Sequence, residues 1–343
     1  MSHLTHLRNA APLLPDAQWL FLKVNPATFT DPGDAARLAA ATRESGLAPE
    51  CLVIEVQESG GTDVAEIARA THAFRAQGFL VAVDDFGAGH SNIDRLLTLK
   101  PDIVKLDRSL VRAGSTHRAP LRDALMPKLV DLLHESGMFV VAEGIETCED
   151  LMLAARSNVD FVQGYLFGMP SAHLVARGAA MPLFEDVFDA LAQMRRIERL
   201  AGDLLLLPYR SGLMQAAARF AGGATTEAAC ADLLALPCTL NCFFFDQGGR
   251  EFMPVLAGAA AKAPSERFAP IADPSAGRWD NRPYFVDAHA NPQQVIASAP
   301  YLSVTGTSLC VTLTIAIQRA ARPVVVGADL DWRRLIEAAP AIF

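Results

Sequence analysis

Two adjacent aspartates at the end of a short apolar run are the residues whose types most clearly suggest chemistry. Asp84 and Asp85 follow the run from Phe79 to Val83, and Gly87 comes shortly after them. Such a run is typical of a buried strand, and the glycine indicates a sharp turn. Neighbouring carboxylates there repel each other and lose hydration, so a divalent cation would stabilise them. The alternative is that one aspartate caps the next helix while the other is solvated.

Polar residues also follow the other apolar runs in the first half of the chain. We expect strands at residues 19–24, 51–56, 79–85, 101–107, 138–144 and 160–168. Helical patterns separate them at residues 31–46, 62–77, 91–99, 118–136 and 147–157. This alternation predicts an α/β fold with parallel strands and crossover helices. The polar residues at or near the strand ends are Asn25, Glu55, Asp84 with Asp85, Lys105, Glu143 and Gln163.

The carboxyl edge of the predicted sheet is therefore rich in oxygen ligands. In a (β/α) barrel this edge carries the active site. If the six strand ends converge, they form a cage suited to hard divalent ions such as Mg²⁺ or Mn²⁺.

Composition restricts the class of protein. The chain has 343 residues, 51% of them apolar and 20% charged, with a formal net charge of −8. These values predict a globular protein and argue against general DNA binding by phosphate neutralisation. We find no apolar run long enough for a membrane span, and no signal-peptide pattern at the start. The six cysteines are scattered, without zinc spacing, which favours a reduced, cytoplasmic protein.

The second half of the chain has a different pattern. Residues 184–236 are helical in periodicity and are expected to form a linker between residues 1–183 and a domain at 237–343. Strand patterns follow at 241–252, 278–288, 299–304, 309–318 and 323–332. The order resembles a PAS/Cache-type α+β sensor domain. A pocket for an unknown small molecule would be lined by Trp279, Arg282, Tyr284, Tyr301 and Asp329, with Arg282 facing a ligand carboxylate. The alternative is that the aromatic residues are core and Arg282 is a structural or surface ion-pair partner.

Several motifs of the first half resemble the EAL family of cyclic di-GMP phosphodiesterases. They are VNP (24–26), IEVQES (54–59), VDDFGAGHSN (83–92), DIVKLD (102–107), VVAEGIET (140–147) and QGYLFGMP (163–170). They occur in the family's order, and the resemblance covers roughly residues 17–171.

The resemblance implies a TIM-barrel-like domain that binds two divalent cations, Mg²⁺ or Mn²⁺, and hydrolyses cyclic di-GMP to linear pGpG. Asn25, Glu55 and Asp84 would be metal ligands, and Asp85 would reach the second metal. Lys105 would hold the attacking water or a phosphate oxygen. Glu143 would be the general base or a metal-site carboxylate. Two loop or secondary residues, Glu58 and Gln163, complete the set.

The Glu-Ala-Leu segment that names the family has no counterpart before Asn25. We expect the first two barrel strands to be missing, together with a metal-binding glutamate and a phosphate-binding arginine. Six strands cannot close an eight-stranded barrel, so two strand edges would be open. Truncation, or coverage of the gap by residues 1–16 and a partner chain, would each account for this.

Three functions follow from these expectations. The first is a metal-dependent cyclic di-GMP phosphodiesterase regulated by the C-terminal domain. The second is a receptor that binds cyclic di-GMP without cutting it. The third is a regulatory scaffold in which the C-terminal domain dimerises. We expect a homodimer, with no DNA and no membrane among its partners.

Overall fold

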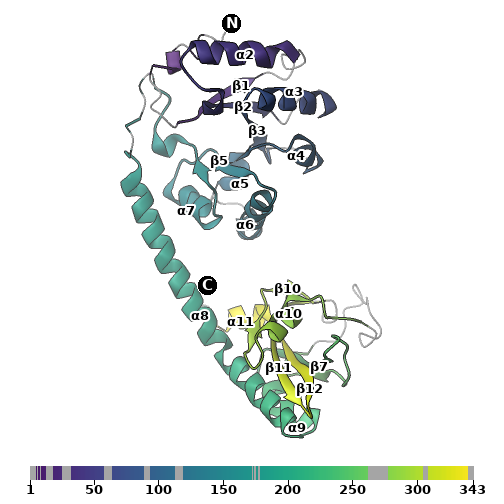
Figure 1. Cartoon of the computed structure of the whole chain (residues 1–343). Helices are drawn as coiled ribbons and strands as arrows, with labels where there is room; N and C mark the ends of the chain where they lie inside the picture. Colours follow the sequence, from purple (N-terminus) through teal and green to yellow (C-terminus); the bar gives the residue numbers. More distant parts are fainter. Residues whose placement is uncertain are drawn as a thin grey trace. The chain divides into compact units, whose positions relative to one another are not determined.

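The chain folds into two compact units, residues 1–193 and 194–343, in the computed structural model (Figure 1). The structure describes residues 5, 7, 9–12, 18–24, 32–57, 64–88, 93–112, 119–171, 173, 175–176, 178–261, 277–303 and 308–338. None of the described helices is both long and apolar enough to cross a membrane.

The first unit is built on a six-stranded parallel sheet in the order β1-β2-β3-β4-β5-β6. The strands are β1 (Leu20–Val24), β2 (Leu52–Gln57), β3 (Leu80–Phe86), β4 (Ile103–Leu106), β5 (Phe139–Ala142) and β6 (Phe161–Val162). The helices are α2 (Pro32–Glu44), α3 (Val64–Ala76), α4 (Ile93–Leu99), α5 (Arg108–Val111), α6 (Ala119–Glu135) and α7 (Cys148–Arg156). Sequential parallel pairing confirms the predicted strand–helix alternation. The described strands form a half-barrel with β1 and β6 at its edges.

Strand alternation divides the side chains of this sheet between two environments. Outward residues such as Ile54, Val81 and Val104 are buried in the large core under the helices. Inward residues form a smaller apolar layer that includes Val53, Ala82 and Ile103. Because side chains alternate along a strand, the next inward positions toward the carboxyl edge are those of the predicted site residues.

The predicted sixth strand, residues 160–168, is much shorter than expected. After β6 the backbone N–H of Ile145 donates to Gln163 O at 3.1 Å, and that of Leu166 donates to Ile145 O at 3.1 Å. A Cβ on Gly164 would lie 2.0 Å from Ile145 O, so only glycine permits this close approach. The chain then forms the 3₁₀ helix η3 (Tyr165–Phe167). Hydrogen bonds to the loop after β5 thus replace the end of the expected strand.

The second unit is built on an antiparallel sheet with long and short strands. The strand order is β10-β11-β12-β7-β8, with β9 paired to β11. The strands are β7 (Thr239–Asp246), β8 (Leu256–Ala257), β9 (Ile296–Ala297), β10 (Tyr301–Leu302), β11 (Leu309–Arg319) and β12 (Arg322–Asp331). The helices are α9 (Thr226–Leu234), α10 (Pro283–Ala290), α11 (Trp332–Glu337) and the C-terminal part of α8 (Met181–Ala221). Strands β11 and β12 confirm two of the predicted strands.

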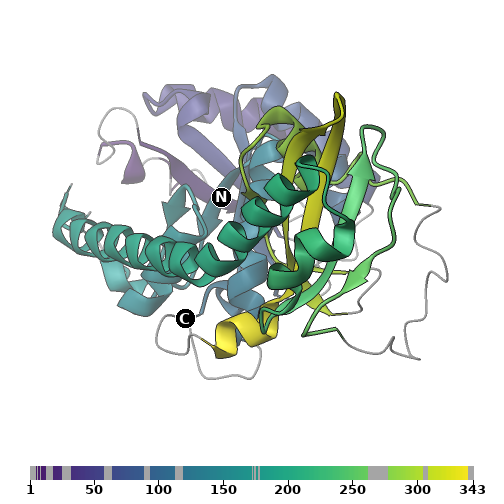
Figure 2. The same ribbon diagram turned by 90° about the horizontal axis from the view of Figure 1, so that it is seen from below.

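Helices cover both faces of this sheet (Figure 2). The last turns of α8 and helix α9 pack on one face, where Leu213, Phe220 and Cys230 are fully buried. Helix α10 packs on the other face through Tyr284 and Phe285. Much of the segment predicted to be a linker therefore contributes to the core of the second unit.

Three local predictions in this half differ from the structure. Residues 278–288, predicted as a strand, contain α10, because Pro283 stands in its first turn and the buried Tyr284, Phe285 and Ala288 have helical spacing. The helical segment predicted at 184–236 is instead α8, which begins at Met181 and continues through Pro208, and the separate α9. Of the strand pattern at 241–252, the structure forms a strand only as far as Asp246 in β7, and a single bridge joins Phe245 to Glu251 beyond it.

Candidate functional site

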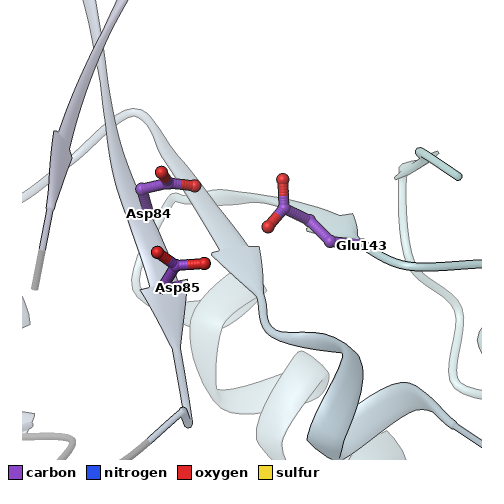
Figure 3. Close-up of side chains that lie close together, drawn as sticks. All are labelled: Asp84, Asp85 and Glu143. Carbon is purple, nitrogen blue, oxygen red and sulfur yellow. The ribbon is translucent and has the colours of Figure 1, made fainter. Parts of the chain in front are cut away.

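Asp84 and Asp85 lie in an irregular part of β3. The register between β3 and β4 shifts between Val83 and Phe86, and Asp85 has a φ of 57°. Neighbouring residues of a regular strand point to opposite faces, whereas such an irregularity re-aims a side chain. Both carboxylates consequently project toward the same space (Figure 3). Aspartate is among the residues that enter this left-handed region most readily, so Asp85 can turn the strand without a glycine.

Glu143 brings a third carboxylate to this space from the end of β5. Its backbone N–H donates to Leu106 O at 3.0 Å, which holds the residue beside β4. One oxygen each from Asp84, Asp85 and Glu143 can be chosen so that all lie within 4.8 Å of one another. Figure 3 shows the three side chains facing each other. An all-oxygen donor set with this spacing fits a hard divalent cation.

Lys105 lies beneath this cluster and binds its carboxylates. Its ammonium nitrogen lies 2.5 Å from Glu55 Oε1, 3.2 Å from Asp84 Oδ1 and 2.6 Å from Glu143 Oε1. Its side chain is only 4% exposed, and it stands 5.6 Å from the ring centre of Phe21. The lysine therefore compensates buried negative charge at the carboxyl ends of β2, β3 and β5.

The pKa values follow from burial and from these ion pairs. Burial lowers the pKa of Lys105, but hydrogen bonds to Glu143 and Glu55 outweigh it and raise the pKa above its usual range. Burial raises the pKa of Asp84, but Lys23 and Lys105 hold it below its usual value. Burial raises the pKa of Glu143, and Lys105 only partly opposes that effect. Glu143 is thus the carboxylate of the cluster that accepts a proton more readily than usual.

Lys23 belongs to the same site, although the sequence analysis missed it. Its ammonium nitrogen lies 2.8 Å from Asp84 Oδ2 and 3.9 Å from Asp85 Oδ2, and its side chain is 51% exposed. The hydrogen bond to Asp84 raises the pKa of Lys23. Lys23 lies two residues after Phe21, which packs in the inward layer, so strand alternation predicts an inward lysine and could have identified it.

The structure accordingly brings together five predicted residues: Glu55, Asp84, Asp85, Lys105 and Glu143. Gln163 lies at the same edge, at the end of β6, with an exposed side chain. Its backbone N–H donates to Ala142 O at 2.8 Å. Asn25 and Glu58 lie outside the described residues.

Three of the residues predicted to line a pocket in the second unit also lie together. Tyr301 and Tyr284 have ring centres 6.0 Å apart. The Tyr301 hydroxyl lies 2.7 Å from Thr312 Oγ1, which donates to Asp329 Oδ1 at 2.6 Å. Asn241 Nδ2 donates to Asp329 Oδ2 at 3.2 Å. A buried polar row thus crosses β7, β12 and β11.

Asp329 is the acidic residue of this row, and it is buried. Burial raises its pKa, although hydrogen bonds from Thr312 and Asn241 oppose the effect. Burial and the nearby Asp329 carboxylate raise the pKa of Tyr284 to about 12. The predicted Arg282 is exposed instead, and its guanidinium lies 5.7 Å from the ring centre of Trp279.

The first unit is thus a parallel (β/α) domain with an acidic, lysine-compensated cluster at the carboxyl edge of its sheet. Residues 1–170 match the family described as EAL domain. This part of the chain belongs to the EAL domain family.

Curated relatives match the same half of the chain. The cyclic di-GMP phosphodiesterase PdeL of Escherichia coli K12 is 30% identical over 159 residues, which are 46% of this chain and 43% of that protein. The probable cyclic di-GMP phosphodiesterase PdeA of the same strain is 31% identical over 149 residues, 42% of this chain and 20% of that protein. The chain spans less than half the length of either relative.

A solved structure is similar over nearly the whole chain. It is that of the Bacillus subtilis YkuI protein, with an EAL domain, in complex with substrate c-di-GMP and calcium. The TM-score is 0.77, with 97% of this chain and 81% of that chain covered at 18% sequence identity. At this identity the likeness shows a shared fold.

Proposed function

We propose that the first unit binds cyclic di-GMP and, with two divalent cations such as Mg²⁺ or Mn²⁺, hydrolyses it to linear pGpG. The observation that carries this proposal is the cluster of Asp84, Asp85 and Glu143, whose oxygens lie within 4.8 Å of one another. The cluster occurs in a domain of the EAL family, and relatives of that domain are named cyclic di-GMP phosphodiesterases.

Each residue of the site has a role in this proposal. Asp84, Asp85 and Glu55 would hold the cations, together with Asn25. Bound divalent cations lower the pKa of water and stabilise the oxygens of an in-line displacement. Lys105 remains protonated among its three carboxylates. Its positive charge stabilises the negative charge that develops on the phosphate during the reaction. Glu143, with its raised pKa, takes a proton from the attacking water. Glu58 and Gln163 would be loop or secondary residues of the site.

The test is turnover of cyclic di-GMP by the full chain with Mg²⁺ or Mn²⁺, with linear pGpG quantified by chromatography. We expect Asp84→Asn to abolish turnover. Asp131→Asn is the matched control, because it removes an exposed carboxylate that pairs with Lys128, outside the site. Absence of hydrolysis by folded wild-type protein, or turnover that survives Asp84→Asn, would contradict the enzymatic proposal.

Lys23 favours a second candidate, a cyclic di-GMP receptor. Its ammonium pairs with Asp84 Oδ2 and lies 3.9 Å from Asp85 Oδ2, so it would compete with a cation for these oxygens. A receptor would bind cyclic di-GMP in calorimetric titrations and leave it intact. Neither binding nor turnover would favour the scaffold interpretation instead.

We also propose that the second unit responds to a small molecule and regulates the first. The buried row of Tyr301, Thr312 and Asp329 supports this, because buried polar side chains under aromatic rings are common in ligand sites. If the row transmits regulation, Asp329→Asn should change the turnover rate of the full chain. An unchanged rate would argue against this role. The cytoplasmic location and the absence of DNA binding stay predictions.

A further inference from the structure

Helix α8 is apolar on two opposite sides where it belongs to the second unit. One side is buried in the core of that unit through residues that follow helical spacing, namely Leu206, Tyr209, Leu213, Ala216, Ala217 and Phe220. The opposite side carries large apolar side chains that are between 54% and 66% exposed: Ile197, Leu200, Leu204, Leu207 and Met214. We refer to these five residues as the α8 stripe. A helix on the surface of a globular unit needs one apolar side to fold, so the second side requires another explanation.

The α8 stripe has the spacing of a coiled-coil seam. Its members follow one another in alternating steps of three and four residues from Ile197 to Leu207, and Ser211 and Met214 continue the pattern. In heptad notation Ile197, Leu204 and Ser211 take position a, while Leu200, Leu207 and Met214 take position d. The seam is roughly 26 Å long at 1.5 Å per residue. This repeat is the pattern that a second helix of the same kind binds.

The charges beside the seam indicate the orientation of that second helix. The g positions are Arg196, Asp203 and Arg210, and the e positions are Ala201, Pro208 and Gln215. In a parallel pair of helices each g residue lies beside an e residue of the other helix. The e residues of this seam are uncharged, so a parallel pair would bring no opposite charges together. Within one chain Arg210 Nη2 already lies 3.9 Å from Asp203 Oδ1. An antiparallel pair joins g to g′ and adds Arg210 of the second copy opposite Asp203, twice by symmetry, so that the two acids and two guanidinium groups alternate across the seam. Flanking charges of this kind set partner and orientation in coiled coils.

We propose that two copies of this chain associate through the α8 stripe as an antiparallel, twofold-symmetric pair of helices. In this register Leu204 faces Leu207 of the other copy, Ile197 faces Met214 and Leu200 faces Ser211. The contact is isologous, because each residue pair occurs twice about one axis. The core of each second unit lies on the side of α8 that faces away from the other copy. One side of α8 therefore packs in its own unit, while the opposite side forms the dimer contact.

The test is sedimentation velocity on the full chain at low and high micromolar concentration. We expect a dimer for the wild type and a monomer for Leu204→Glu, which places two carboxylates in the central layers. Leu302→Glu is the matched control, since Leu302 is 62% exposed but lies on β10, away from the stripe; it should remain dimeric. Far-ultraviolet circular dichroism verifies that each variant is folded.

A charge exchange tests the antiparallel register. Asp203→Arg should weaken the dimer at least about tenfold, because the new guanidinium would lie opposite Arg210 of the other copy as well as beside Arg210 of its own chain. The double variant Asp203→Arg with Arg210→Asp should restore the wild-type dissociation constant. A monomeric wild type would overturn the proposal. A dimer that survives Leu204→Glu would overturn it as well, since the interface would then lie elsewhere. Failure of the double variant to restore association would overturn the antiparallel arrangement.

Discussion

Replacement of Lys105 by methionine should destabilise the first unit strongly when no divalent cation is present. The ammonium lies within 3.2 Å of oxygens on Glu55, Asp84 and Glu143. Methionine retains an unbranched apolar side chain of similar reach but removes the charge. Three largely buried carboxylates would then lose their shared counter-charge. Removal of one partner from a buried ion pair typically costs about 3–5 kcal/mol.

The lower end of that range applies to this site. Lys23 remains beside Asp84, and the side chain of Glu143 is 15% exposed, so water and one lysine still stabilise part of the negative charge. We expect a loss of about 3 kcal/mol at neutral pH. For a unit of this size each 1 kcal/mol corresponds to about 2–4 °C, so the unfolding midpoint should fall by about 6–12 °C.

The loss should depend on pH with a definite sign. In the wild-type protein Lys23 and Lys105 hold the pKa of Asp84 below its usual value of 3.8. A depressed folded pKa contributes stability that is present above the unfolded value and is lost as the pH falls through the folded pKa. The difference between wild type and Lys105→Met should therefore shrink in acid.

Divalent cations should rescue the variant more than the wild type. Mg²⁺ or Mn²⁺ bound at Asp84 and Asp85, beside Glu143, would replace the missing positive charge. A ligand at 100 times its dissociation constant adds about 2.7 kcal/mol to the folded state. Rescue by cation is the signature that separates loss of charge compensation from a packing defect.

The fluorescence of Trp19 can follow urea unfolding of the first unit. Trp19 is the only tryptophan in that unit, and its ring centre lies 5.4 Å from that of Phe161, so it reports on contact between β1 and β6. Trp279→Phe and Trp332→Phe remove the signal of the second unit. The matched control is Lys128→Met, which breaks an exposed pair and should change stability by less than about 1 kcal/mol. A loss below about 1 kcal/mol for Lys105→Met in chelator would refute the reasoning.

Three further predictions concern other parts of the chain. Lys23→Met should tighten Mn²⁺ binding about two- to fivefold in calorimetry, because a half-exposed ion pair with Asp84 is worth up to about 1 kcal/mol; weaker binding would mean that Lys23 assists the cation. Gly164→Ala should lower the stability of the first unit by at least about 2 kcal/mol in urea unfolding, because its Cβ would lie 2.0 Å from a backbone oxygen; a neutral result would contradict the close approach. Asp329 has a raised folded pKa, so its contribution to stability is present below about 3.8 and is lost as the pH rises through the folded pKa. Asp329→Asn should remove this slope in unfolding measurements between acid and neutral pH, and an unchanged slope would assign the pH dependence to another group.

Much of the first unit could be predicted because its pattern is local. Apolar runs alternate with helical segments, and each parallel strand pairs with the next one in the sequence. Since parallel strands end at one edge, the polar residues after them had to meet there. Glu55, Lys105 and Glu143 were identified in this way before their contacts were known.

Predictions were less accurate where neighbouring structure decides the conformation. The aromatic pattern around Tyr284 suits a strand or a buried helix equally well, and Pro283 with the sheet beneath it decides for α10. The expected sixth strand ends early because Gly164 brings the chain against Ile145. The PAS/Cache-like character of the second unit, the missing barrel strands and the dimer stay predictions.

The amino-acid sequence by itself determined the order of strands and helices and the presence of acidic residues and a lysine at one edge of the sheet. Periodicity and short-range steric preferences encode these features, so they can be read along the chain. Only the tertiary structure decided that Asp84 and Asp85 point the same way, because the register shift depends on pairing between β3 and β4. It alone placed Lys23 on that pair and left the α8 stripe exposed. Ion pairing and burial depend on which distant residues meet, and these contacts arise only after the chain has folded.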